Sequence, residues 1–176
     1  MVKDPDLEND PGVFVNVDWA RTRAYNLGIN GLYVNLKGRE AFGSVAPDER
    51  EALLREISER LLGLIDPATG APAISRVFRR EEVYASAGHD DIAPDLIIGY
   101  AKGTRGSDES ALGGLPPDVL VDNVDAWNGD HCMDPAAVPG ILLTSRPLRR
   151  RSASLQELPA AILAEFGVDD FPVQEK

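Results

Sequence analysis

The clearest hydrophobic pattern in the chain lies in residues 47–65. Leucine and isoleucine recur there at steps of three and four residues, which places them on one face of a helix. Pro47 suits the first helical position, and the carboxylates of Asp48 and Glu49 favour the positive end of the helix dipole. The pattern predicts an amphipathic helix that the following Asp-Pro pair ends.

Short, continuous apolar runs form a second pattern, at residues 96–100, 119–121 and 141–144. Bounded by glycine, proline and aspartate, such runs are typical of strands buried on both faces of a sheet. The remaining predicted elements are strands at residues 13–17 and 31–36, a loop or short helical turn at 18–30, an exposed strand or hairpin at 74–84, and a helix at about 158–166. Together these patterns predict an α/β protein with part of a mixed sheet.

Composition fits one globular domain. The chain has 176 residues, of which 43% are hydrophobic, enough to form a core without stabilising disulfides or metal ions. No window approaches the roughly 18 apolar residues of a membrane span, and the polar residues 1–12 are typical of a flexible lead-in. The single cysteine excludes an internal disulfide and fits a reducing compartment, so we expect a cytoplasmic protein. The net charge of −11 argues against broad binding to nucleic acid or anionic membranes.

Candidate chemistry is concentrated in the turn at residues 127–135. This turn holds His131, one of two histidines, and Cys132, the only cysteine. Imidazole nitrogen is a good zinc ligand, but a catalytic site needs about three protein ligands. Asp130, His131 and Cys132 are adjacent, and consecutive side chains diverge, so they cannot simply converge on one ion. From the residues alone, His131 is either an ordinary loop histidine or one ligand of a metal site.

Several blocks of residues follow one another in an order that resembles a known family. The blocks are residues 17–25, 31–40, 66–70, 80–84, 93–100, 127–131, 138–142 and 158–163. They resemble the C-terminal portion of the alkaline-phosphatase superfamily, in its type I phosphodiesterase/nucleotide pyrophosphatase branch of predicted phosphohydrolases and phosphomutases. The resemblance implies that residues 13–176 are the C-terminal portion of an alkaline-phosphatase-like domain, with a cap-like insertion at about residues 38–95.

The resemblance also implies a role for His131. In this family the histidine of the Gly-Asp-His block binds one of two metal ions, usually zinc, that clamp a phosphoryl group. The family's nucleophile and its other ligand blocks match no segment of this chain. We therefore expect the C-terminal part of a metal-dependent phosphodiesterase or phosphohydrolase, inactive alone, which acts on a small phosphate ester once the missing N-terminal half joins it. The alternative is an inactive remnant that serves as a binding or interaction module.

Two further residues are candidates for contacts around the metal or the substrate. Asp130 could orient a metal ligand or form an Asx turn. Arg105 lies in a loop that, in the family, follows a sheet strand near the site, and it could bind a phosphate bidentately or make a structural salt bridge. The sequence leaves both pairs of alternatives open.

Overall fold

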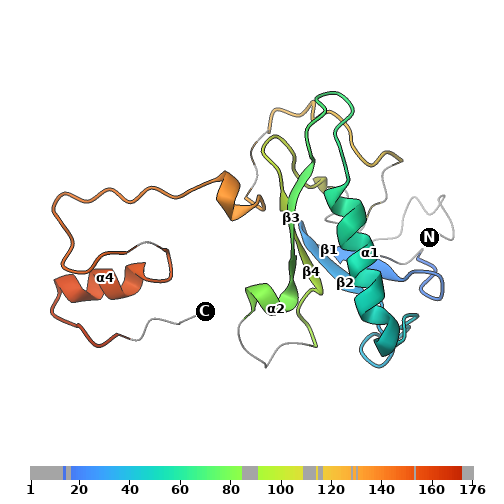
Figure 1. Ribbon diagram of the computed structural model, residues 1–176, viewed down its shortest axis with the longest axis horizontal. Helices are drawn as coiled ribbons and strands as arrows, with labels where there is room; N and C mark the ends of the chain where they lie inside the picture. Colours follow the sequence, from blue (N-terminus) through green and yellow to red (C-terminus); the bar gives the residue numbers. More distant parts are fainter. Residues whose placement is uncertain are drawn as a thin grey trace. The chain divides into compact units, whose positions relative to one another are not determined.

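The structure, a computed structural model, describes residues 14, 17–84, 91–108, 114, 117–127, 129, 131–152 and 154–171. The chain divides into two compact units, Met1–Val138 and Pro139–Lys176. The described residues form an α/β structure with one four-stranded antiparallel sheet and three α-helices (Figure 1). None of these helices is long and apolar enough to cross a membrane.

The sheet belongs to the first unit and has the strand order β1-β2-β4-β3. Its strands are β1 (Ala24–Leu27), β2 (Gly31–Val34), β3 (Ile74–Arg79) and β4 (Leu96–Tyr100). A three-residue turn joins β1 to β2, and Gly28 has a positive φ of 75° there, a conformation that glycine adopts without strain. Such a short connection forces the two strands to run antiparallel. The predicted mixed sheet is therefore wrong for the described strands, which all pair antiparallel.

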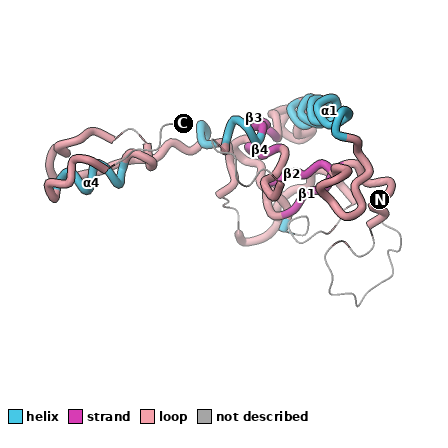
Figure 2. Tube along the Cα trace, turned by 90° about the horizontal axis from the view of Figure 1, so that it is seen from below, coloured by secondary structure: helices cyan, strands magenta, loops and turns pink. Residues whose placement is uncertain are grey.

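The main helix lies along one face of this sheet (Figures 1 and 2). A short 3-10 turn, Pro47–Glu49, leads into α1 (Arg50–Leu62). Leu53 and Leu54 of α1 are buried in the core together with Val34, Val45 and Leu96. The predicted amphipathic helix is confirmed, although it ends at Leu62 rather than residue 65.

A fully buried carboxylate, Asp95, ties this core together just before β4. Its oxygens accept hydrogen bonds from both terminal nitrogens of Arg39 at 3.1 and 2.7 Å, from Nε and Nη2 of Arg50 at 3.0 and 2.7 Å, and from the N–H of Val34 at 2.7 Å. Burial would raise the pKa of Asp95, but the hydrogen bonds from Arg39, Val34 and Arg50 outweigh it and hold that pKa below its ordinary value. Asp95 thus stays ionised and links β2, the segment after it, and α1.

Some of the other predicted elements are confirmed, and others are corrected. Strands at 31–36 and 96–100 and the last helix, α4 (Leu158–Glu165), are confirmed. The segment 74–84 forms β3 followed by the short helix α2 (Arg80–Val83), and the expected loop at 18–30 contains β1. The strand expected at 13–17 falls mostly outside the described residues.

The apolar runs at 119–121 and 141–144 form no strand, so those two predictions are wrong. Val119 is 82% exposed and Ile141 is 86% exposed. A strand of this composition is stable only when other strands pair with its backbone and apolar side chains cover it. Neither run has such partners among the described residues.

The second unit is built around α4. Ala160, Ala161 and Ala164 of this helix are buried. The backbone N–H of Arg149 donates to Oε1 of Glu165 at 2.6 Å, and its Nη1 donates to the carbonyl of Ala164 at 2.6 Å, which satisfies an acceptor at the end of the helix. The preceding loop is thereby fixed to the C-terminal turn of α4.

Candidate functional site

The turn that carries His131 lies beside the end of β4. Met133 forms a parallel bridge with Tyr100, the last residue of β4. The N–H of Asp134 donates to the carbonyl of Tyr100 at 3.1 Å. Met133 and Asp134 are thus fixed where β4, one of the two inner strands of the sheet, ends.

Asp134 holds this turn in place, and sequence reasoning missed it. The side chain is buried. Its Oδ2 accepts a hydrogen bond from the hydroxyl of Ser75 on β3 at 3.0 Å, and its Oδ1 accepts one from the N–H of Ala136 at 3.0 Å. A Cβ at Gly99 would lie 3.3 Å from the Cβ of Asp134, so the small residue at position 99 permits the close approach. The Asp-Pro pair that starts the 3-10 helix Pro135–Ala137 is a capping signal that could have identified Asp134.

His131 itself is exposed, three residues before this anchor. An exposed imidazole on a fixed turn is suited to act as one ligand of an ion. Asp130 lies outside the described residues. Within the described part of the chain, no group of three or more histidine, cysteine, aspartate or glutamate side chains could hold a metal ion.

Arg105 is attached to the same turn. Its Nη1 donates to the carbonyl of Trp127 at 3.2 Å, its Nη2 to Oδ1 of Asp108 at 2.6 Å and its Nε to the carbonyl of Gly106 at 3.2 Å. These bonds connect the loop after β4 with the segment that leads to His131. Within the described residues, three of the five N–H donors of the guanidinium have acceptors.

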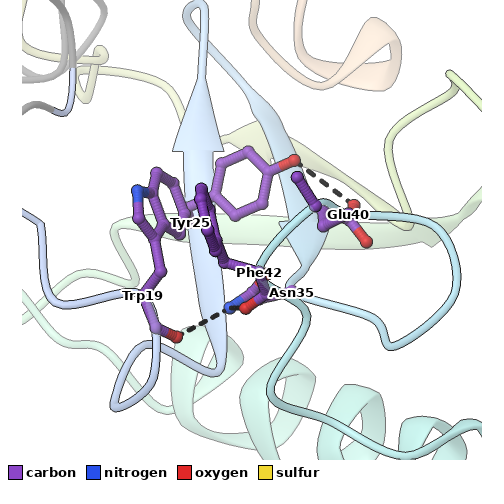
Figure 3. Close-up of a pocket in the computed structure, with 6 residues that line it drawn as sticks. Trp19, Tyr25, Asn35, Glu40 and Phe42 are labelled. Carbon is purple, nitrogen blue, oxygen red and sulfur yellow. Dashed lines mark hydrogen bonds between the residues drawn. The ribbon is translucent and has the colours of Figure 1, made fainter.

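A separate pocket of about 270 Å³ lies near β1, among Trp19, Tyr25, Asn35, Glu40, Ala41 and Phe42. Figure 3 shows its three aromatic rings gathered at one place, with the Glu40 carboxylate beside the Tyr25 hydroxyl. The rings of Trp19 and Tyr25 meet edge to face, with centroids 5.3 Å apart and planes at 88°. Tyr25 donates its hydroxyl hydrogen to Oε1 of Glu40 at 3.3 Å. Burial, and then the charge of Glu40, raise the pKa of Tyr25 to about 12, so the phenol stays protonated.

The Asn35 side chain connects the segments that carry Trp19 and Phe42. Its Nδ2 donates to the carbonyls of Trp19 and Thr22, both at 2.9 Å, and to that of Phe42 at 3.1 Å. Its Oδ1 is buried and accepts no hydrogen bond from any described residue. The three carbonyls around the nitrogen establish the orientation of the amide, so the unpaired atom is the oxygen.

Comparison with protein-family models, with characterised proteins and with solved structures gives no match to this chain. The resemblance to the alkaline-phosphatase superfamily therefore remains a prediction from the residue blocks of the sequence. Among the described residues, the anchored turn at His131 and the aromatic pocket are two candidate places for a site.

Proposed function

We propose that this chain is the C-terminal part of a metal-dependent phosphodiesterase or phosphohydrolase of the alkaline-phosphatase type. In this proposal His131 supplies one ligand to a divalent ion, zinc, and residues 38–95 form a cap-like insertion. The observation that carries the proposal is the position of His131, exposed on a turn that Asp134 fixes to the end of β4.

The chain's own residues would contribute position rather than complete chemistry. The hydrogen bonds of Asp134 and Arg105 hold the turn from two sides, which reduces the entropy that His131 loses when it binds an ion. When bound, the metal would polarise the phosphoryl group of a small phosphate ester. The nucleophile and the remaining ligands would come from the missing N-terminal half.

The exposed apolar side chains support the need for such a partner. Val119, Val121 and Val124, in one segment of the first unit, are among the most exposed large hydrophobic residues that the structure describes. Large exposed apolar patches on proteins mark interaction surfaces. The same observation favours the second candidate function, in which the chain is an inactive remnant that serves as an interaction module.

Reconstitution tests the first proposal. The chain is mixed with an N-terminal polypeptide that carries the family's nucleophile and remaining ligands, zinc is added, and hydrolysis of a nitrophenyl phosphodiester is followed. We expect the mixture to be active and each part to be inactive alone. His131→Ala should remove zinc binding and activity together, because a site with one ligand fewer holds the ion weakly.

The other histidine provides a matched control. His89→Ala removes the same imidazole group and should leave zinc stoichiometry and hydrolysis unchanged. If the mixture hydrolyses the ester equally well with His131→Ala, the ligand role is wrong. If the two polypeptides associate without zinc binding or hydrolysis, the interaction module is the correct function.

A further inference from the structure

We propose that the pocket between Trp19, Tyr25 and Phe42 binds a small alkylated ammonium ion that carries an O–H or N–H donor. The proposal does not depend on the phosphate-ester function, because it rests on a different part of the first unit. It names a binding site, distinct from the turn at His131, and the chemical class of its ligand.

The walls of the pocket are suited to a cation. Phe42 is 69% exposed, although a phenylalanine ring in a monomer usually finds cover. Trp19 and Tyr25 are supported from behind, since Phe14 meets the Trp19 ring at 5.7 Å and Tyr33 stacks on the Tyr25 ring at 5.4 Å. Rings that are held in this way need little further ordering when a ligand binds. An alkylated ammonium is attracted to such faces by the ring quadrupole and covers them with methyl groups.

One polar atom of the lining, Oδ1 of Asn35, lacks a hydrogen-bond donor among the described residues. The Tyr25 hydroxyl and the Nδ2 of Asn35 already donate within the chain. The Asn35 oxygen is buried without a donor among the described residues, which costs free energy until a ligand or water supplies one. Glu40 adds a carboxylate to the lining, which also accepts hydrogen bonds from Tyr25, Arg39 and the N–H of Leu36. A ligand with a positive charge and one donor matches these groups, and an anion does not.

Arg39 does not reverse this preference. Its guanidinium bonds to Glu40 at 2.8 Å and to Asp95 at 2.7 Å, and its side chain is largely buried. Its charge is therefore divided between two carboxylates rather than directed at the opening. The net charge of −11 further favours the approach of cations over that of anions.

The size and rigidity of the pocket indicate a small ligand. Its volume of about 270 Å³ is near the lower end for small-molecule sites. Asn35 joins the backbone at Trp19 to the backbone at Phe42, so the distance between these two walls is fixed before a ligand arrives. Choline is an ion of suitable size that carries one hydroxyl donor.

Fluorescence of Trp19 provides the direct test. The chain has two tryptophans, and Trp127→Phe leaves Trp19 as the single reporter. Trp127 is 69% exposed, and its hydrogen bonds to described residues use only the backbone carbonyl, so the background variant should fold normally. Choline is titrated against 3,3-dimethylbutan-1-ol, a neutral molecule of the same shape. We expect saturable quenching by choline and binding of the neutral alcohol that is weaker by about 3- to 10-fold.

A pair of phenylalanine variants locates the site. Phe42→Ala should weaken choline binding by about 3- to 10-fold, because one ring face is lost. Phe166→Ala removes another largely exposed ring, from the second unit, and should leave binding unchanged. Circular dichroism of both variants checks that the fold is retained.

Three results would overturn the proposal. One is the absence of saturable binding of choline. Another is equal affinity for choline and its neutral isostere, which would make the pocket a simple apolar depression. The third is equal loss of binding in both phenylalanine variants, which would show that choline acts on the whole chain rather than at this pocket.

Discussion

Substitution of Asp95 by asparagine should lower the stability of the first unit more than any substitution on its surface. The new side chain has the same shape, but it carries no charge and turns one acceptor into a donor. In the native protein Asp95 accepts two hydrogen bonds from Arg39, two from Arg50 and one from the N–H of Val34. Asparagine cannot accept all of these bonds, and its NH2 group must face at least one of the existing donors.

The size of the effect follows from burial. Asp95 has no exposed surface, and removing one partner of a buried ion pair costs about 3–5 kcal/mol, because the remaining charge is left uncompensated. Single domains are stable by about 5–15 kcal/mol, so this loss is a large share of the total. With a urea dependence of about 1–3 kcal/mol per molar, the midpoint of unfolding should fall by at least about 1 M.

Urea unfolding followed by circular dichroism measures this change. Asp122→Asn is the matched control, because Asp122 is exposed and the same chemical change there should leave the midpoint where it is. Equal midpoints for the Asp95 and Asp122 variants would refute the reasoning. The ion pairs at Asp95 would then contribute nothing beyond what solvent provides.

Three further predictions concern the same unit. Because the pKa of Asp95 is lowered in the folded state, the stability that this carboxylate contributes should be present at neutral pH and be lost as the pH falls below about 4. Urea midpoints that do not decline in that range would contradict this prediction. Leu54→Ala should lower the free energy of unfolding by about 2–5 kcal/mol, because it leaves a cavity in the core. Leu62→Ala, at a half-exposed position, should lower it by less than about 1 kcal/mol. Thermal unfolding measures both changes, and equal losses would contradict the core assignment. The Tyr25 phenolate should form only near pH 12, so the stability that this raised pKa contributes persists below about pH 10 and disappears as the pH rises towards 12. Glu40→Gln should lower that pKa in a spectrophotometric titration, and an unchanged curve would contradict the contribution of Glu40.

Elements with a strong local pattern were predicted well. The helix α1 was identified because its leucines and isoleucines share one face, and β4 because its apolar run is bounded by turn residues. The strand β1 was missed because the sequence AYNL carries neither a continuous apolar run nor a clear alternation. It is a strand because a three-residue turn brings it against β2, where Tyr25 pairs with Tyr33.

The runs at 119–121 and 141–144 illustrate the opposite error. Their composition suits buried strands, but composition does not supply the neighbouring strands that such a structure requires. In the described structure both runs are irregular, and their large side chains are exposed. Local preference is decisive for a helix, whose backbone bonds are internal, and insufficient for a strand, whose bonds are made to another segment.

The sequence by itself determined the α/β class and the main helices, and it selected the turn at His131 as the candidate site. Those features depend on residue type and on spacing within a few turns of chain. Only the tertiary structure decided that Asp134 fixes that turn, that Asp95 is buried between Arg39 and Arg50, and that Asn35 closes an aromatic pocket. Each of these depends on contacts that span many intervening residues, and the side chains meet only after the sheet has brought their segments together.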